Sequence, residues 1–381
     1  MTEIPEFSAK VSPKVSIGLP CRNAARSLPA ALDSLLAQTL ADFEVIAVDD
    51  GSTDRTWDVL CDYARRDARI RPLRQPEAGR HYGVALAWNA ACAASIAPYI
   101  ARMDADDISL PRRLEAQVAL LDADPTLGLV SGLVRFGGDR AARQGYAVHV
   151  DWLNTLTTPE AISTSRFVDS PIANPSVMFR RELFERLGGA RPNTPATTDN
   201  AVGHATGNAT GHATGTAPFP EDYEQWLRWL ERGVRMGKVA EEILVWNDPP
   251  TRLSRTAAEY SVEAFARIKA QYLWRWLIRH NPGHPRVWVW GAGRVSRQKL
   301  APLLDMGLEI EAYVDIDANK IGQSVHGIPV LPREAILTYS PSDPATPFIL
   351  ANVASRGARE EITAWLEGLG YQMGVGAVAV G

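Results

Sequence analysis

Short apolar runs that alternate with stretches of helical spacing constrain the fold of this chain more than any other feature. Residues 14–20 and 43–48 are apolar runs closed by breaking or polar residues, as expected of buried strands. Between them, leucines recur at the helical period at positions 28, 32, 35 and 36. A strand, a helix and a second strand at this spacing indicate a parallel βαβ unit. The chain is therefore expected to be an α/β protein.

Acidic side chains follow two of the predicted strands. Residues 49–54 read Asp-Asp-Gly-Ser-Thr-Asp, and Asp104, Asp106 and Asp107 follow the run 96–103. The carboxyl ends of parallel strands lie at the edge where open α/β sheets bind ligands. Carboxylates this close repel unless a cation compensates, and Mg²⁺ or Mn²⁺ suits oxygen ligands completed by water and substrate phosphate. The alternative is an acidic turn before a helix N-terminus, where aspartate is favoured anyway.

Length and composition narrow the class of protein. A chain of 381 residues exceeds a typical single domain, so two domains are expected. A net charge of -4 without a dense Lys/Arg block argues against nucleic acid as a partner. The N-terminus is acidic and polar, and no run has the length of a transmembrane segment, which predicts a soluble, cytoplasmic protein. Cys21, Cys61 and Cys92 form no even framework or Cys-x-x-Cys pair, which favours core residues over disulfides or zinc ligands.

Six ordered segments of residues 14–255 resemble the family 2 glycosyltransferases. They are residues 20–23 (Pro-Cys-Arg-Asn), 48–54, 103–107, 174–181, 187–191 and 221–228. Their common order is more specific than any one motif. The resemblance implies a GT-A fold for residues 14–255, with a mixed, mostly parallel sheet flanked by helices. It also implies a nucleotide-sugar donor, with a UDP-sugar favoured, and a glycan or lipid-linked acceptor.

The resemblance also implies roles for single residues. Asp50 matches the acid that hydrogen-bonds the nucleotide base, and Asp222 matches the base that deprotonates the acceptor hydroxyl. Pro20, Arg22 and Asn23 match positions on the nucleotide side. Asp104 and Asp106 match the Asp-x-Asp motif, which holds a divalent cation (Mg²⁺ or Mn²⁺) against the diphosphate and touches the ribose. Asp107 matches a further metal ligand.

The chemistry of sugar transfer agrees with these roles. Displacing a sugar from a diphosphate needs charge neutralisation on the leaving group and a carboxylate beside the attacking hydroxyl. Direct displacement from the opposite face predicts an inverting enzyme. Two alternatives stay open, because Asp222 also suits the N-terminus of the helix expected at 223–232, and Asn23 also suits a turn.

Two positions depart from the family pattern. Arg22 stands where many members have a tyrosine that stacks on the base, which leaves the identity of the base open. Pro249 stands where many members have a histidine near the metal. The cation would then rest on carboxylates, diphosphate and water alone.

Two further segments separate the predicted parts of the chain. Residues 193–218 contain an imperfect Gly-His/Asn-Ala-Thr repeat with almost no large apolar side chain, which predicts a flexible insertion, either a lid or a disordered loop. His204 and His212 in it fit chance repeat expansion better than metal binding. Residues 256–280 are expected to be helical, within a linker over 256–285. This helix either packs between domains or contacts a membrane surface at the inner face.

A second α/β domain is expected over residues 286–381. A strand, a glycine turn with Gly291 and Gly293, a helix, and a strand ending in Asp315 follow in a Rossmann-like order. Ser296 replaces the third glycine, and the segment 315–330 resembles small nucleotide- or nucleotide-sugar-binding domains more than a dehydrogenase. Nucleotide binding and a purely structural or regulatory role both stay open.

The sequence as a whole predicts an inverting glycosyltransferase in polysaccharide or surface-glycan biosynthesis. The alternative is a non-catalytic nucleotide-sugar- or glycan-binding protein on a degenerate transferase domain, which the intact Asp104, Asp106 and Asp222 argue against. A NAD-dependent oxidoreductase is a weaker third hypothesis, because no catalytic Tyr-Lys or His arrangement accompanies the glycine turn.

Overall fold

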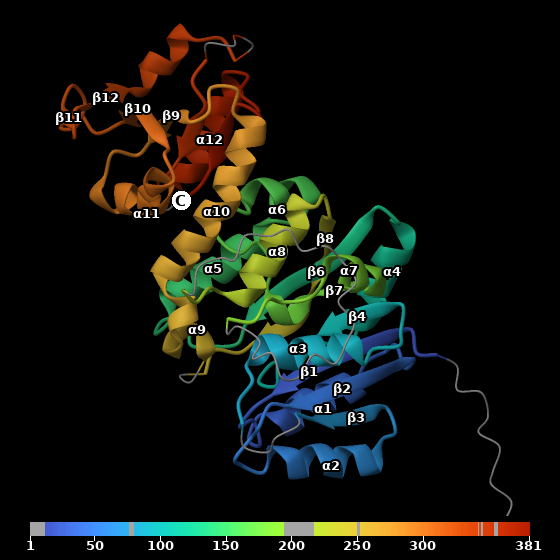
Figure 1. Ribbon diagram of the computed structural model, residues 1–381. Coiled ribbons are helices and arrows are strands. Elements are labelled where there is room, and N and C mark those ends of the chain that lie inside the picture. Colours follow the sequence, from blue (N-terminus) through green and yellow to red (C-terminus); the bar gives the residue numbers. More distant parts are fainter. Residues whose placement is uncertain are drawn as a thin grey trace, which may run out of the picture. The chain divides into compact units, whose positions relative to one another are not determined.

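The chain folds into two compact units, whose helices and strands are labelled in Figure 1. The computed structural model describes residues 12–75, 80–193, 217–249, 252–341, 343, 346–353 and 357–381. Unit 1 comprises Met1–Thr157, Ile172–Ala213 and Val234–Pro249, and unit 2 comprises Thr158–Pro171, Thr214–Gly233 and Pro250–Gly381. The sequence also predicts a flexible N-terminus over residues 1–13. Residues 1–11 of it and the repeat with His204 and His212 lie outside the described residues.

Unit 1 is built on a mixed, mostly parallel sheet, as predicted. In spatial order its strands are β3 (Ile70–Arg74), β2 (Phe43–Asp49), β1 (Val15–Cys21), β4 (Tyr99–Arg102), β7 (Met178–Arg180), β6 (Leu127–Phe136), β8 (Arg235–Trp246) and β5 (Ile108–Ser109). Strands β3, β2, β1 and β4 run parallel, β7 runs antiparallel to both of its neighbours, and β6 pairs with β8 in parallel.

Helices cover both faces of this sheet. On one face, alternate apolar residues of β1 belong to one core with helices α1 (Leu28–Leu36), α2 (Thr56–Arg66), α4 (Arg113–Ala123) and α5 (Gln144–Thr155), of which α5 contacts β6. On the other face lies α3 (Val84–Ala93), where a Cβ at Gly18 would come 2.6 Å from the Trp88 ring. A further short helix, α7 (Arg181–Leu187), follows β7. Glycine at position 18 therefore allows the indole to lie flat against β1.

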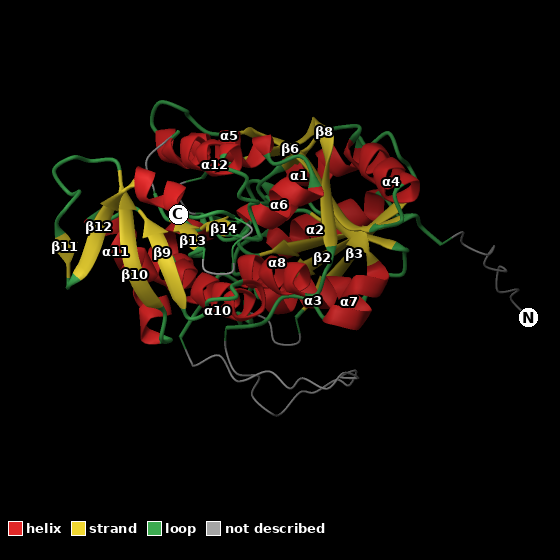
Figure 2. Ribbon diagram, turned by 90° about the horizontal axis from the view of Figure 1, so that it is seen from above, coloured by secondary structure: helices red, strands yellow, loops and turns green. Residues whose placement is uncertain are grey.

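Unit 2 contains a second, smaller sheet. Its strands, in spatial order, are β11 (Ser324–Val325), β12 (Ile328–Pro332), β10 (Glu309–Asp315), β9 (Arg286–Trp290), β13 (Ile349–Ala351) and β14 (Ala377–Ala379). All neighbouring pairs are parallel except β11 with β12. From β12 to β14, the chain order of the strands is third, second, first, fourth and fifth, which is the doubly wound order. The predicted smaller α/β domain is therefore present (Figure 2).

The side chains of β9 divide between the two faces of the smaller sheet. Val287 and Val289 belong to the core formed with α10 (Val262–His280) and α11 (Arg294–Asp305). Trp288 and Trp290 belong to the core formed with the 3-10 helix η3 (Arg333–Thr338) and α12 (Ala358–Gly368). This alternation is the period of a strand buried on both faces.

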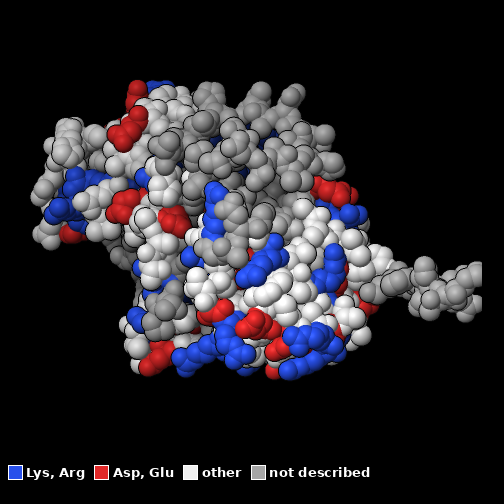
Figure 3. All heavy atoms as spheres, turned by 60° about the horizontal axis from the view of Figure 1, so that its bottom comes forward, with Lys and Arg blue, Asp and Glu red and all other residues white. Residues whose placement is uncertain are grey.

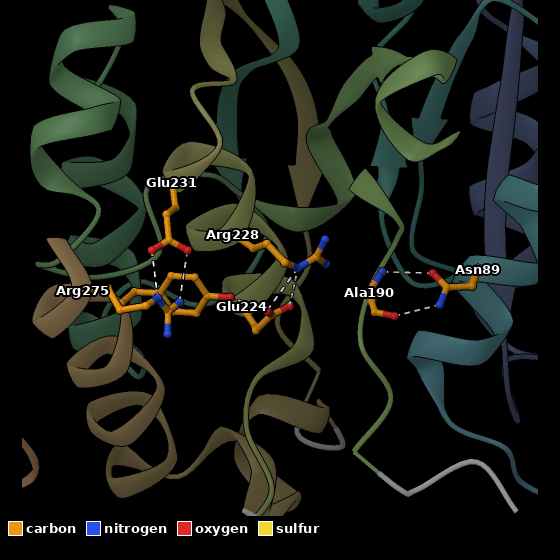
Figure 4. A network of polar contacts seen from close by, with 7 residues as sticks. Asn89, Ala190, Glu224, Arg228, Glu231 and Arg275 are labelled. Atoms are coloured by element: carbon orange, nitrogen blue, oxygen red, sulfur yellow. Dashed lines mark hydrogen bonds and ion pairs between the residues drawn. The ribbon is translucent and has the colours of Figure 1, made fainter. Parts of the chain in front are cut away.

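The structure divides the chain differently from the predicted boundaries at 255 and 285. Helices α6 (Pro159–Ser165) and α8 (Glu221–Glu231) belong to unit 2, together with the short α9 (Leu253–Thr256) and η2 (Ala258–Tyr260). The reason is packing between α8 and α10: the Tyr223 and Phe265 rings stack at 5.4 Å, and Glu231 accepts hydrogen bonds from Arg275 (Figure 4).

Helix α10 is shorter than the helical segment predicted over 256–280. It begins at Val262, where the Ser261 hydroxyl accepts a hydrogen bond from the Ala264 amide. Its apolar face is buried inside unit 2, and Arg275 and Arg279 pair with Glu231, which favours the packed helix over a membrane-surface helix. None of the described helices is long and apolar enough to cross a bilayer.

Charges on the surface are mixed. On the face drawn in Figure 3, Lys and Arg side chains lie beside Asp and Glu side chains instead of forming one extended patch. Helix α2 provides two such pairs, Arg55 with Asp58 at 3.5 Å and Arg65 with Asp62 at 2.9 Å. The described part of this face thus lacks the basic stripe that is typical of nucleic-acid binding.

Candidate active site

Three neighbouring strands of unit 1 end at one edge of the sheet and carry most of the predicted donor-site residues. In the register of β1 with β2, Cys21 lies opposite Asp49, and in that of β1 with β4, Gly18 lies opposite Arg102. The structure therefore brings together, at the carboxyl edge of β2, β1 and β4, the predicted residues Pro20, Arg22, Asn23, Asp50, Asp104, Asp106 and Asp107.

Asn23 joins the ends of β1 and β2. It has a positive φ of 48°, its amide donates to the Ser52 hydroxyl at 3.0 Å, and its side-chain oxygen accepts from the Thr53 amide at 2.8 Å. These bonds support the turn interpretation of Asn23, which shapes the edge. The neighbouring Arg22 is exposed.

Asp50 is buried under the segment that leads into α3. Only 3% of the residue is exposed, and its carboxylate accepts hydrogen bonds from the Tyr82 amide at 2.9 Å and the Gly83 amide at 3.0 Å. His81 Nε2 lies 3.2 Å from the same carboxylate. The contact with the nucleotide base stays a prediction, because in this structure Asp50 holds a neighbouring segment of its own chain.

Asp104 is a half-buried carboxylate at this edge. Its side chain is 30% exposed, and the buried Arg102 donates from Nε to Asp104 Oδ1 at 3.0 Å. The Arg102 guanidinium lies 5.1 Å from the centre of the Trp88 ring. It also reaches the side-chain oxygen of Asn174 at 3.2 Å in the amide orientation that satisfies both groups. Arg102 therefore fixes the direction of Asp104.

Asp107 is anchored inside the loop after β4. The residue is 1% exposed, and its Oδ1 accepts from the Asn247 amide at 2.8 Å, while Asn247 Nδ2 donates to the Asp106 carbonyl at 2.7 Å. Within the described ranges, no three His, Cys, Asp or Glu side chains gather closely enough to hold a metal ion. The sequence motif thus combines half-buried acids, Asp104 and Asp106, with a buried one that ties the loop to the end of β8.

Arg113 lies beneath this loop and was not anticipated from the sequence. It is 1% exposed, donates from Nη2 to the Arg102 carbonyl at 2.5 Å, and donates from Nε to Gln117 Oε1 at 3.1 Å. Burial lowers the pKa of Arg113 to about 10, against the opposing effect of Asp107 and Asp104, so the group stays charged at neutral pH. The available signal was its place on the buried stripe of the following helix, one turn before Gln117.

Asp222 lies in the first turn of α8, in unit 2. It is half-buried, and its Oδ1 accepts from the Tyr223 amide at 2.7 Å. The other two acids of the turn are buried and bonded, Glu221 to the Tyr260 hydroxyl at 2.6 Å and Glu224 to Tyr272 and Arg228. Asp222 is therefore the most accessible acid of the turn. The helix-start and catalytic interpretations remain compatible.

The predicted residues of the Rossmann-like turn meet at one edge of unit 2. Asp315 accepts from the Ala292 amide and from Lys320 Nζ, each at 3.1 Å. Gly291 has a φ of +119°, and a Cβ there would lie 2.5 Å from the Asn352 carbonyl oxygen. At Gly293, a Cβ would meet nothing within 4 Å. Burial acts to raise the pKa of Asp315, but hydrogen bonds from Asp317, Lys320 and Ala292 outweigh burial, and the pKa lies below its usual value. The carboxylate therefore stabilises the turn to which it belongs. Nucleotide binding at this edge stays a prediction.

Comparison with known proteins identifies the larger part of unit 1. Residues 16–188 match the model of the family described as glycosyl transferase family 2. Residues 16–188 form a family 2 glycosyltransferase domain. This assignment covers the strand ends with Asp50 and Asp104, while Asp222 and all of unit 2 except Thr158–Pro171 lie beyond the matched residues.

Relatives of this family cover different shares of the chain. The putative glycosyltransferase EpsE of Bacillus subtilis is 27% identical over 254 residues, which are 66% of this chain and 79% of EpsE. The uncharacterized glycosyltransferase EpsJ of the same organism is 34% identical over 182 residues, 46% of this chain. The chain spans only 50% of EpsJ and 12% of the chondroitin synthase of Pasteurella multocida, to which it is 36% identical over 118 residues.

The chain is also similar to a solved structure. The mannosyltransferase PcManGT of Pyrobaculum calidifontis, determined with GDP-Man and Mn²⁺, is 22% identical, with a TM-score of 0.45, over 78% of this chain and 69% of that one.

The donor set at the edge of unit 1 fits a divalent cation. Asp104 and Asp106 offer half-buried carboxylate oxygens on one short loop. Hard cations such as Mg²⁺ prefer oxygen and are commonly held by one or two carboxylates, with water and substrate phosphate as the other ligands. Asp104 and Asp106 would supply the two carboxylates of such a site, and water and the substrate phosphate would supply the other ligands.

Proposed function

We propose that the chain transfers a sugar from a nucleoside diphosphate sugar, with UDP as the favoured nucleotide, to an acceptor hydroxyl with inversion at the anomeric carbon. The observation that carries this proposal is the convergence of Asp50, Asp104 and Asp106 at the ends of adjacent parallel strands in a family 2 domain. The carboxyl edge of a parallel sheet is where α/β proteins bind nucleotides.

The residues of the chain would divide the work between binding and proton transfer. Asp104, oriented by Arg102, and Asp106 would hold Mg²⁺ or Mn²⁺. When bound, such a cation supplies positive charge to the leaving diphosphate. Asp222 would accept the proton of the acceptor hydroxyl as its oxygen bonds to the anomeric carbon and the bond to the diphosphate oxygen breaks.

The names of two relatives support a glycan acceptor. Chondroitin synthase and hyaluronan synthase of Pasteurella multocida are each 36% identical to this chain over 118 residues. Both names denote synthesis of a polysaccharide. We therefore infer that the acceptor is a growing glycan, free or lipid-linked, in polysaccharide or surface-glycan assembly on the cytoplasmic side of a membrane.

Calorimetric titration with UDP, with and without Mn²⁺, tests the donor site. Asp104→Asn is the test variant, and Asp315→Asn is the matched control, the same substitution at a strand end of unit 2. We expect metal-dependent UDP binding that is weakened at least about tenfold by Asp104→Asn and unchanged by Asp315→Asn. Equal loss in both variants, or binding indifferent to metal, would contradict the proposal.

A turnover assay separates the enzyme from the non-catalytic alternative. UDP release from a panel of UDP-sugars, with oligosaccharide acceptors, is expected in the wild type. Metal-dependent UDP binding without release from any donor would favour a binding protein instead.

A further inference from the structure

A cavity of about 330 Å³ lies within unit 2, bounded by α6, α8, α10 and the C-terminal strand β14. None of its lining residues belongs to the strand ends described above. Ligand pockets range from roughly 300 to 1,000 Å³, so this cavity has room for a molecule with one ring rather than for a nucleotide sugar. Its lining residues are Ser163, Thr164, Arg166, Phe167, Leu227, Leu230, Glu231, Tyr272, Trp276, Arg279, His280, Gly374 and Val378.

Positive charge exceeds negative charge around the cavity. Glu231 accepts from Arg275 Nε at 2.9 Å and from Arg279 Nη2 at 3.3 Å. Among the described residues, the side chain hydrogen-bonded to the Arg166 guanidinium is Ser163, whose hydroxyl accepts from Nη1 at 3.1 Å. Among the lining residues, Arg166, Arg279 and Glu231 leave one positive charge, and Arg275, which does not line the cavity, pairs with the same carboxylate. Burial lowers the pKa of Arg166 to about 10, so it stays protonated at neutral pH.

Aromatic rings form another part of the wall. The Arg166 guanidinium lies 4.9 Å from the Phe167 ring centre and 5.9 Å from that of Trp276. Trp276 stacks on His280 at 4.6 Å with an interplanar angle of 20°. Burial, together with Arg166 and Arg279, lowers the pKa of His280, which therefore presents a neutral imidazole at neutral pH. Aromatic walls with a few fixed polar groups are the usual composition of a small-molecule site.

We propose that this cavity binds a small phosphorylated ligand with a single ring, of the size of a monosaccharide phosphate. A phosphate monoester carries about -1.5 to -2 charges at pH 7, which suits the excess of positive charge on the lining residues. Arg166 and Arg279 supply guanidinium donors suited to phosphate oxygens, and the Ser163 hydroxyl, which accepts from Arg166, still has its proton to donate. The rings of Phe167 and Trp276, whose planes are tilted by 59°, supply an apolar corner for the ring of the ligand.

Calorimetric titration of the full chain tests this site, with UDP and Mn²⁺ kept saturating so that the edge of unit 1 does not contribute. The probes are glucose 1-phosphate, glucose and inorganic phosphate. The variants are Arg166→Gln and Arg279→Gln, and Arg286→Gln is the control, because Arg286 is exposed, pairs with Glu311 at 3.4 Å and does not line the cavity. We expect glucose 1-phosphate to bind the wild type and the control with a Kd below about 1 mM and Arg166→Gln at least about tenfold more weakly.

Three results would overturn the proposal. The first is no heat from glucose 1-phosphate up to about 1 mM in the wild type. The second is unchanged affinity in both arginine variants. The third is inorganic phosphate binding as tightly as glucose 1-phosphate, which would leave the rings without a role. Circular dichroism checks that the variants fold. If Arg166→Gln does not fold, the affinity of Arg279→Gln tests the proposal instead, because Glu231 keeps Arg275 as a partner in that variant.

Discussion

In both units, an aspartate at a strand end accepts hydrogen bonds from a neighbouring turn, but the two edges differ in their chemistry. In unit 1, the buried Asp50 accepts from the amides of Tyr82 and Gly83. In unit 2, Asp315 accepts from the amide of Ala292 and from Lys320. Both acids follow the second strand of a parallel unit, and both organise a neighbouring turn. An acid at a strand end is therefore not by itself a ligand site.

The adjacent strand makes the difference between the two edges. Next to β1, strand β4 leads to Asp104 and Asp106, which lie half-buried at the edge of unit 1. Next to β9, strand β13 leads to the buried amide Asn352, and Lys320 already balances the charge of Asp315. A cation needs carboxylate oxygens that the protein's own donors leave accessible. At the edge of unit 2, Asp315 and the more exposed Asp317 both lie within 3.4 Å of Lys320 Nζ, which balances their charge.

The largest expected effect tests whether unit 2 contributes to the chemistry at all. Asp222→Asn removes the proposed base while keeping the shape of the first turn of α8. We expect kcat to fall by about 10²–10⁴-fold, because a positioned general base contributes that much. UDP binding should stay unchanged. The measurements are UDP release with donor and acceptor, and calorimetry with UDP.

Glu221→Gln is the matched control for Asp222→Asn. Glu221 lies one residue earlier in the same turn, but it is 2% exposed and bonded to Tyr260. Its substitution should affect stability more than kcat. A wild-type kcat for Asp222→Asn, or an equal fall in kcat for both variants, would remove the catalytic role from Asp222.

The sequence predicted the strands and the edge at which the motif residues lie better than it predicted the hydrogen bonds and packing contacts of those residues. Periodicity located β1, β2 and α1, since apolar runs and leucine spacing follow directly from burial. The assignment of α8 to unit 2 was missed, because it depends on contacts with α10 that lie more than forty positions apart, such as Tyr272 with Glu224. The burial of Asp107 was also invisible, since its partner Asn247 is 140 residues away.

The second expected effect compares the glycines of the two edges. Gly51 has a φ of +67°, and a Cβ there would lie 2.2 Å from the Arg80 carbonyl oxygen, whereas Gly293 has a φ of -64° and open space. Gly51→Ala should lower the free energy of unfolding by about 2–4 kcal/mol, through strain and overlap. Gly293→Ala should change it by less than about 0.5 kcal/mol. Urea unfolding of the full chain measures both, and similar values for the two variants would contradict the close contact over Gly51.

The smallest expected effect compares two lysines, one in each unit. Lys238 on β8 is 6% exposed and donates to the Leu153 carbonyl at 2.5 Å, and burial lowers its pKa from 10.5 to about 7. Burial also lowers the pKa of Lys269 on α10, to about 8, but there Asp169 favours the charged form. Between about pH 7 and 10.5 the unfolded chain holds the proton that the folded Lys238 has lost, so stability rises with pH across this window.

Lys238→Met should therefore stabilise the protein most at low pH. Removing the buried ammonium should raise the free energy of unfolding by about 1–2 kcal/mol near pH 6.5, after the loss of the bond to Leu153, and this gain should fade near pH 9.5. Lys269→Met is the matched variant, and its gain should be smaller, because two carbonyl oxygens, those of Val168 and Val380, lose a donor. Urea unfolding at the two pH values measures the effect. A gain that does not depend on pH would show that the Lys238 ammonium is solvated, and the two units would then not differ in this respect.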